Sequence, residues 1–452
     1  MRTTERLAEF IAGHRYADLP AAVIEQAKYT IADTLGCGIA GYTAAEQECR
    51  WIIEFVKDLG GRGEATVFLD GFRTSTPQAA LANGTMIHTI DFDDTHMGSI
   101  SHFSSALVPT VFALGERLKS DGPSIINAYV IGFEVGARIG RAMMPSHYRY
   151  WHPTSTFGSI ASAAAACKLL NLDVVMTEQV LGLAADMAAG LRYCIDKGDF
   201  SKSLHPGFAA MRGIMLALLG QKGVNGPKGL LEYPTGFCRA FSEDPQMEKI
   251  TEGLGASYEI AANSLKAFPT ILISHSSIQA ISDLVGKYSI IPSEIKRIHL
   301  RISETAKDQG KNYNPETLLA ARLSIPFCIA LAALEKKVSL AQFTEEKLKD
   351  PEIREFMAKV EIDADRSLNE RYPGTLASIT EIETVNQGRL RQEVIYPKGN
   401  PKNPMGKDEV AQKFRELCSL TLPPEKYEEL LGLLFRLEAV SDLDQVVGLL
   451  QA

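Results

Sequence analysis

The sequence predicts a mainly α protein in which a large helical domain is interrupted by a smaller α+β domain. Three observations support this fold class. Apolar residues recur at helical spacing over most of residues 3–260, alternation typical of strands begins after about residue 266, and helical spacing returns near the C-terminus. The expected boundaries are 1–265 plus 403–452 for the helical domain and 266–402 for the α+β domain.

The helices expected before residue 260 are rich in alanine and glycine and poor in charge, which indicates close packing on most sides. Pro20 stands near the start of an early helix in which Ile24, Ala27 and Ile31 recur at helical spacing. Further helical segments are expected at residues 77–94, 106–118, 123–143, 158–170, 177–191 and 205–221.

The region after residue 266 contains both strands and helices. Strand-like alternation is found at residues 295–303, 357–365 and 376–396, and the last of these has a hairpin turn at Asn386-Gln387-Gly388. Helices are expected between them at residues 315–334 and 344–357. A turn-rich loop at 396–405 leads back to amphipathic helices at 408–420 and 424–450.

Composition restricts the function classes. The net charge is −8, with no basic patch of the kind that binds nucleic acid or anionic membrane. Seven cysteines without CxxC spacing predict buried reduced thiols rather than disulfides or a zinc knuckle. We recognise neither a signal peptide nor an apolar run long enough to span a bilayer. We therefore expect a cytoplasmic protein without membrane or nucleic-acid partners.

The segment from His88 to His102 is the densest group of chemically active side chains. If a helix that begins near residue 77 continues through Thr95, then His88, Asp91 and Thr95 lie on one face. His102 follows a flexible loop and can turn back over the end of this helix. A buried carboxylate needs cations or donors, so Asp91 requires partners from elsewhere. Capping of the helix end is the structural alternative for these side chains.

Metal-ligand residue types are also present in this segment, but their spacing disfavours a metal site. Asp93 and Asp94 would point away from the face that carries His88 and Asp91, and the HExxH and zinc-binding cysteine patterns are absent. We therefore expect no metal. For His96, the sequence leaves open whether it supports the loop or contacts a ligand.

Two lysines later in the chain could bind an anion. Lys202 and His205 precede Pro206, which is suited to begin a helix, and a lysine beside a helix N-terminus makes an anion site. Lys266 lies where the composition changes, with His275 nine residues later, so it is expected near a cleft between domains. A solvated lysine beside a helix cap and an ordinary linker lysine are the alternatives.

His152 stands between aromatic residues and a helix of small residues, a context typical of a pocket wall or of a packed structural histidine. The chain shows no Gly-x-Ser-x-Gly elbow, no GxGxxG after a strand and no Walker loop. We therefore expect no nucleotide or nicotinamide cofactor. Proton chemistry on a small anionic molecule, carried by His, Asp and Lys side chains, is what remains.

Five motifs in order carry a family resemblance: NG followed by H and DFDDTH, then HPTSTFG, KSLHPGFAA, LKAFP and ARLSIPF. They resemble the MmgE/PrpD family, which includes 2-methylcitrate dehydratases, cis-aconitate decarboxylases and iminodisuccinate epimerases. The resemblance implies an enzyme without cofactor or metal, a helical domain with an α+β lid domain, and a homodimer.

The resemblance also implies a site. Its catalytic residues would be His102, Asp91, Lys202, Lys266 and His152, and its substrate-binding residues would be Thr95, His88, His205 and His275. His102 would be the general acid or base, with the lysines holding substrate carboxylates. Phe327 replaces a tyrosine that the family often has, so one hydroxyl is missing.

The first functional hypothesis is a hydro-lyase acting on a small di- or tricarboxylic acid of the 2-methylcitrate type, by proton abstraction next to a carboxylate. A decarboxylase of the cis-aconitate type and an epimerase or racemase of an iminodisuccinate-like substrate need the same groups. A helical protein that only binds an anion is the non-enzymatic alternative.

Overall fold

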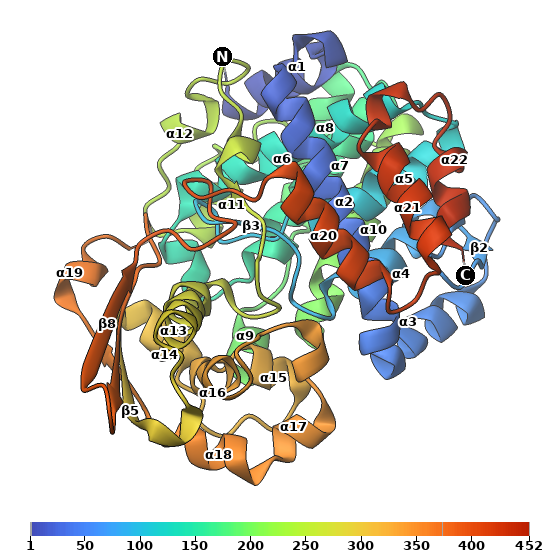
Figure 1. The fold of residues 1–452 in the computed structure, drawn as a ribbon. Coiled ribbons are helices and arrows are strands. Elements are labelled where there is room, and N and C mark those ends of the chain that lie inside the picture. The colour runs from blue at the N-terminus through green and yellow to red at the C-terminus, as the bar shows by residue number, and fades with distance from the viewer. Residues whose placement is uncertain (1, 373, 452) are drawn as a thin grey trace.

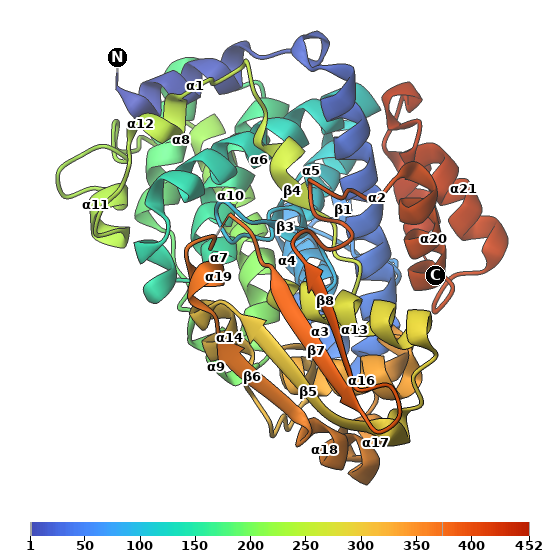
Figure 2. The same ribbon diagram turned by 60° about the vertical axis from the view of Figure 1, so that its left-hand side comes forward.

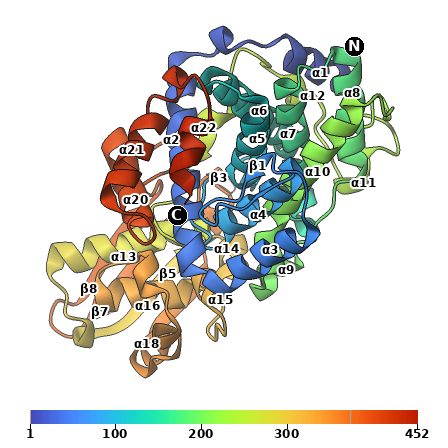
Figure 3. The ribbon, with the colours of Figure 1, turned by 90° about the vertical axis from the view of Figure 1, so that its right-hand side faces the viewer.

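The computed structural model describes residues 2–372 and 374–451. Over these residues the chain folds into a large helical domain and a smaller α+β domain, as the sequence predicts (Figure 1). Figure 3 shows the α+β domain at one end of the molecule, below the helical domain. No helix among the described residues is both long and apolar enough to cross a bilayer.

The first part of the helical domain contains these helices: α1 (Thr3–Gly13), α2 (Ala21–Ala44), α3 (Glu46–Leu59), α4 (Thr76–His88), α5 (Ser104–Leu118), α6 (Gly122–Met143), α7 (Pro153–Leu169), α8 (Val174–Asp186), α9 (Tyr193–Lys197), α10 (Ser201–Gln221), α11 (Phe237–Phe241) and α12 (Glu248–Thr251). Two pairs of very short antiparallel strands lie among them: β1 (Ala65–Thr66) with β2 (Arg73–Thr74), and β3 (Thr95–His96) with β4 (Asn263–Ser264).

The C-terminal end of the chain returns to the helical domain as three helices: α20 (Lys407–Cys418), α21 (Pro424–Leu434) and α22 (Asp444–Val447). In Figure 1, α20 in red lies against α2 in blue, although the two are far apart in sequence. One continuous apolar core combines side chains from α1 to α8 and from α10 with Phe414, Leu434 and Leu450 from this returning segment. The tail is therefore an integral part of the helical domain.

The α+β domain contains a four-stranded sheet in the order β6-β5-β7-β8, built from β5 (Ile295–Ile302), β6 (Val360–Ala364), β7 (Ser378–Thr384) and β8 (Arg389–Val394) (Figure 2). β5 pairs with β6 in parallel and with β7 antiparallel, and β7 forms the predicted hairpin with β8. Its helices are α13 (His275–Tyr288), α14 (Glu304–Gly310), α15 (Leu318–Arg322), α16 (Ile325–Glu335), α17 (Glu345–Lys349), α18 (Pro351–Met357) and α19 (Arg366–Asn369).

A second apolar core joins one face of this sheet to α13 and α16. Ile298, Leu300 and Ile382 of the sheet pack against Ile281 and Ile329 of the two helices. The alternation of buried and exposed residues along β5 is the pattern of a strand with one solvated face. Each domain thus has its own main core.

Three predicted helices end earlier or break where a capping residue intervenes. The segment 315–334 forms two helices, because the Ser324 side chain accepts a hydrogen bond from the backbone N–H of Phe327 and begins α16. The segment 344–357 is divided before Pro351. The predicted helix 77–94 ends at His88, because Asp91 has a left-handed backbone with φ of 51°.

All seven cysteines are free and buried, as expected for reduced thiols.

Candidate active site

A small cavity of about 50 Å³ lies where the two domains meet. Its lining includes the side chains that the sequence marked as catalytic, together with one marked as substrate-binding: Asp91, Thr95, His102, His152, Lys202 and Lys266. They come from three separate stretches of the helical domain and from the segment after β4. The fold therefore brings side chains of four motifs that are distant in sequence to one place.

Asp91 lies at the centre of this polar wall. Its Oδ1 is 2.7 Å from Lys202 Nζ and 3.1 Å from Lys266 Nζ, and its backbone carbonyl accepts a hydrogen bond from Lys266. The left-handed backbone of Asp91 turns the chain after α4. We call His88, Asp91, His102, Lys202 and Lys266 the lysine cluster.

Burial and ion pairing shift the pKa values of Asp91 and Lys266 in opposite directions. Burial raises the pKa of Asp91, but Lys202 and Lys266 outweigh it and hold that pKa well below its usual range. Burial lowers the pKa of the Lys266 ammonium, while Asp91 opposes the shift. Asp91 is therefore shared by two buried ammonium groups, whose remaining N–H donors could bind an anion.

His88 links Lys202 to a second carboxylate. Its Nδ1 lies 2.9 Å from both oxygens of Asp93 and therefore donates, and its Nε2 accepts from Lys202 Nζ at 2.8 Å. Burial lowers the pKa of His88, and Lys202 adds to this effect. The neutral ring thus orients the Lys202 ammonium toward Asp91.

His102 has the geometry of a general base. Its Nδ1 is 2.7 Å from the backbone carbonyl of Asp94, and since a carbonyl can only accept, Nδ1 carries the proton. Nε2 is then left with a lone pair. Burial holds the pKa of His102 well below its usual value, although Asp93 opposes the shift. The backbone N–H of His102 donates to Thr154 Oγ1, which fixes the residue to the start of α7.

The remaining histidine predictions have different outcomes. His152 lines the cavity, and His205 lies behind it with the two Nδ1 atoms 2.6 Å apart. His88 is fully buried beneath Lys202 and His275 packs against Phe268, so none of His88, His205 and His275 is part of the cavity lining. Direct substrate contact stays a prediction for all four residues named for it, of which Thr95 alone lines the cavity.

Two geometric assumptions about the polar segment are wrong. Asp91 and Thr95 do not extend the face of α4, since the helix ends at His88 and Thr95 belongs to β3. Asp93 does not point away from His88 but accepts its hydrogen bond. The polar side chains converge because the chain turns sharply after the helix, which spacing along a helix could not reveal.

Pro206 does not begin a helix either. α10 starts at Ser201, so Pro206 is inside it and Lys202 is in its first turn. The backbone N–H of Ser201 donates to the side chain of Asp199, which precedes the N-cap residue Phe200. Lys202 consequently acts through its ammonium group, whose position is fixed by His88 and Asp91.

Lys202 reaches the lysine cluster because α4 and α10 pack unusually closely. Gly84 and Gly207 face each other at their crossing, and a Cβ atom at Gly207 would come within 2.4 Å of the carbonyl oxygen of Leu81. Only glycine allows this approach. The small residues of these two helices therefore determine the separation between Lys202 and His88.

His96 is a structural residue of the loop. Its Nδ1 is 2.9 Å from Ser99 Oγ, and its Nε2 is 3.3 Å from a carboxylate oxygen of Glu259. This settles the alternative that the sequence left open. The loop that carries His102 is thus tied to the segment just before β4.

Lys413 of α20 supports the site from behind and was not predicted. Its ammonium donates to the backbone carbonyls of Phe92 and Lys266 and is 2.7 Å from Asp33 of α2. It thereby holds the two segments that carry Asp91 and Lys266. A single lysine in an amphipathic tail helix gives no sequence signal for such a role.

The opposite wall of the cavity is largely apolar and belongs to the α+β domain. Its side chains include Ile271, Leu272, Ile273, Leu323, Leu376 and Tyr372. Tyr148 of the helical domain also lines the cavity. Phe327 is buried in the core of the α+β domain and is not part of the lining, so the tyrosines at the cavity are Tyr148 and Tyr372.

Two family domains match the chain. The MmgE/PrpD N-terminal domain covers residues 5–250 and the MmgE/PrpD C-terminal domain covers residues 268–435. The protein belongs to the MmgE/PrpD family. The predicted membership is confirmed.

Relatives in this family are enzymes. The chain is 28% identical to the cis-aconitate decarboxylase of Aspergillus terreus, over 96% of this chain and 92% of the relative. It is also 28% identical to the human cis-aconitate decarboxylase, over 99% of this chain and 94% of the relative. Identity to the mitochondrial 2-methylcitrate dehydratase of Yarrowia lipolytica is 23%, over 99% and 90% of the two chains.

Proposed function

We propose that the protein is a lyase whose own side chains remove a proton from the carbon next to a carboxylate of a small di- or tricarboxylic acid. One observation carries the proposal: His102, with its lone pair on Nε2, lines the same cavity as two buried lysines that share a single carboxylate. A base beside two ammonium groups is what the formation of a carboxylate-stabilised carbanion requires.

In the proposed reaction, His102 Nε2 takes the proton from the carbon next to the carboxylate. The electron pair of the C–H bond passes into that carboxylate as an enediolate, which Lys202 and Lys266 stabilise. The pair then returns to form a C=C bond while the neighbouring hydroxyl leaves as water with a proton from a second donor. His152 and Tyr372, which line the cavity, are the candidates for this donor.

Decarboxylation is the second candidate, and two observations favour it. The identity to the cis-aconitate decarboxylases is 26–28%, against 23% to the 2-methylcitrate dehydratase. The apolar wall around Leu323 and Leu376 would also destabilise a carboxylate held against it, which favours its loss as carbon dioxide. The electron pair of the broken C–C bond would pass to the substrate carbon, which then takes a proton from the enzyme.

Substrate entry requires movement of one wall. A cavity of about 50 Å³ holds only a few water molecules and cannot accept a tricarboxylic acid. The apolar wall belongs to the α+β domain, which has its own core, so we propose that residues 266–402 move as a lid. Closure would then exclude water from the lysine cluster.

The test is turnover of 2-methylcitrate, citrate, cis-aconitate and iminodisuccinate, followed by NMR in deuterated water together with carbon dioxide release. Loss of water with formation of an alkene supports the hydro-lyase. Carbon dioxide release supports the second candidate instead, and deuterium exchange without net conversion would indicate an epimerase. If His102→Asn leaves turnover unchanged on every acid that reacts, the assigned base is wrong.

A further inference from the structure

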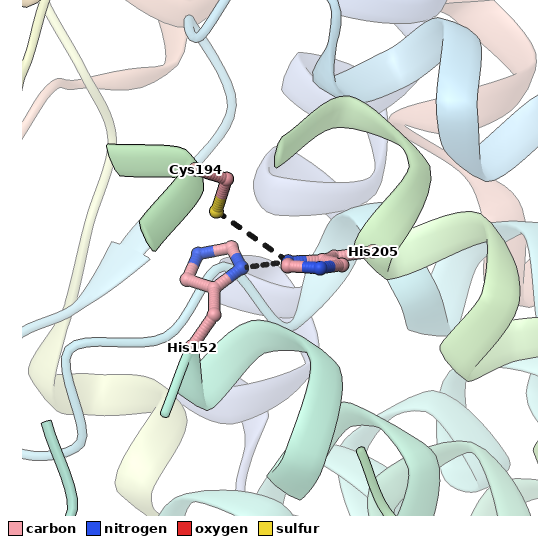
Figure 4. Close-up of side chains that lie close together, drawn as sticks. All are labelled: His152, Cys194 and His205. Carbon is pink, nitrogen blue, oxygen red and sulfur yellow. Dashed lines mark hydrogen bonds between the residues drawn. The ribbon is translucent and has the colours of Figure 1, made fainter. Parts of the chain in front are cut away.

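A second group of reactive side chains lies beside the cavity. His152 at the start of α7, Cys194 on α9 and His205 on α10 point toward one another, as Figure 4 shows. The Nδ1 atoms of His152 and His205 are 2.6 Å apart, and Cys194 Sγ is 3.8 Å from His205 Nδ1. We call these three residues the thiol cluster.

The donor atoms of the thiol cluster are suited to a soft or borderline divalent cation. One sulfur and two imidazole nitrogens all lie within 4.8 Å of one another. Burial holds the pKa of His152 well below its usual value and lowers that of His205 to about 4, so both rings are neutral. One of the two Nδ1 atoms donates the hydrogen bond between them, and a bound cation would take the place of that proton. Thiolate and imidazole are the ligands that zinc prefers over harder cations.

The geometry is close to that of a bound metal. Ligand atoms around a tetrahedral zinc are about 3.3 to 3.8 Å apart, given bonds of about 2.0 Å to nitrogen and 2.3 Å to sulfur. The Sγ–Nδ1 separation of 3.8 Å already fits. The two Nδ1 atoms, now at 2.6 Å, would need to separate by less than 1 Å, about the extent of a small ring rotation.

The lysine cluster contains a similar set of metal-ligand atoms, but ammonium groups already contact some of these atoms. His88, Asp91 and His102 also offer three atoms within 4.8 Å of one another. Two ammonium groups already contact Asp91, and Lys202 also donates to His88 Nε2. A dication there would have to displace or repel these charges. No ammonium group hydrogen-bonds to the thiol cluster among the described residues, although, besides burial, the charge of Lys202 lowers the pKa of both His152 and His205.

The thiol cluster has a route to solvent and a side that faces the cavity. Cys194 and His152 are buried, but His205 is half-buried, and Leu191 beside Cys194 is 58% exposed. His152 is also part of the cavity lining. Three protein ligands with a fourth position open to water or substrate are the arrangement of an exchangeable rather than a closed structural zinc site.

We propose that His152, Cys194 and His205 bind one zinc ion, and that zinc binding inhibits the enzyme by engaging His152. The inhibitory part rests on the proposed function, in which His152 faces the substrate. The binding part does not, because it depends only on the three ligands. Zinc would then act as a reversible inhibitor at the edge of the active site.

Binding is tested on the full chain, purified with a chelator and then titrated with zinc chloride. We expect one zinc per chain in the wild type, and Cys194→Ser should weaken binding by about 100-fold or more. Cobalt substitution should give a thiolate-to-cobalt charge-transfer band that Cys194→Ser and Cys194→Ala both lack. Cys238→Ser, at a buried thiol in the helical core, is the matched control and should retain the band.

Equal zinc affinity in the wild type and both Cys194 variants, or a cobalt complex without the charge-transfer band, would overturn the site. Since neither measurement needs substrate, failure of the proposed function leaves this test intact. In the activity assay, Cys194→Ser should retain chelator-treated turnover and lose sensitivity to zinc. If zinc binds to the three ligands but does not lower turnover, the zinc site is supported and the proposed inhibition is wrong.

Discussion

Two clusters of similar side chains lie within one site, and they differ in what surrounds them. The rings of His88 and His152, one from each cluster, are 6.4 Å apart. In the lysine cluster, Asp91 is shared by two ammonium groups, whereas the thiol cluster contains neutral donors. On residue types alone, both clusters would be interpreted as metal sites. In the lysine cluster the ammonium groups occupy the ligand atoms directly, which favours anion binding. The thiol cluster is affected by the charge of Lys202 only at a distance, so within the described part of the chain its ligand atoms are not occupied by an ammonium group.

The largest predicted effect that tests this difference between the two clusters is a loss of turnover. Lys202→Met removes one of the two charges that stabilise the developing anion, so kcat/KM should fall by about 100- to 1000-fold. Steady-state kinetics on the substrate identified above measures this loss. Lys168→Met, at a half-buried lysine that donates to the carbonyl of Ala12, is the control and should leave kcat/KM unchanged. Unaltered kinetics in Lys202→Met would remove the functional distinction between the clusters.

The second effect is on stability. Asp91→Asn leaves two buried ammonium groups without their carboxylate, which should lower the free energy of unfolding by about 3 to 5 kcal/mol. Urea unfolding measures this change, and adding Lys202→Met should recover part of it, because one unpaired charge is removed. Asp308→Asn, in an exposed pair with Lys311, should have no measurable effect. If Asp91→Asn lowers the free energy of unfolding no more than Asp308→Asn does, then Asp91 does not form a stabilising ion pair with the two lysines.

The third effect is on the pH dependence of turnover. Because the pKa of His102 is well below its ordinary value of 6.5, its neutral basic form should persist as the pH falls through 6.5. We expect the acid limb of kcat/KM against pH to lie below 6.5 and to disappear in His102→Asn. An acid limb above 6.5 would mean that substrate reacts with a different group or with protonated His102.

The smallest effect separates two adjacent carboxylates. Burial, reinforced by Asp93, raises the pKa of Asp94 from 3.8 to about 7, so Asp94 destabilises the fold increasingly as the pH rises from 3.8 through 7. Asp94→Asn should therefore stabilise the protein by about 2 kcal/mol at pH 8 and by much less at pH 5. Urea unfolding at both pH values gives the difference.

Asp93→Asn is the matched control for Asp94→Asn. Burial raises the pKa of Asp93, but His88 and His102 more than offset this and lower it below 3.8, so Asp93 stabilises the fold at all pH values above 3.8. Its substitution should destabilise the protein at pH 8, opposite in sign to Asp94→Asn. If both substitutions change the free energy of unfolding in the same direction at pH 8, the environments assigned to Asp93 and Asp94 are wrong.

Local sequence was sufficient for most of the fold. Alternation marked β5, β7 and β8, and the turn at Asn386-Gln387-Gly388 forms the hairpin, because strand periodicity reflects a sheet with one solvated face. The predicted ends of the helices were less accurate. α4 ends at His88 because Asp91 adopts a left-handed backbone, which a propensity for helix at residues 77–94 does not encode.

The sequence alone determined the residue types of the site, the family and the two-domain helical architecture. The tertiary structure decided their relationships: the sharing of Asp91 by Lys202 and Lys266, the hydrogen bond that leaves His102 Nε2 unprotonated, and the support from Lys413. It also placed Cys194 beside His205. These contacts join residues that are between 8 and 321 positions apart in the sequence. They depend on helix crossings and chain turns, which no local periodicity specifies.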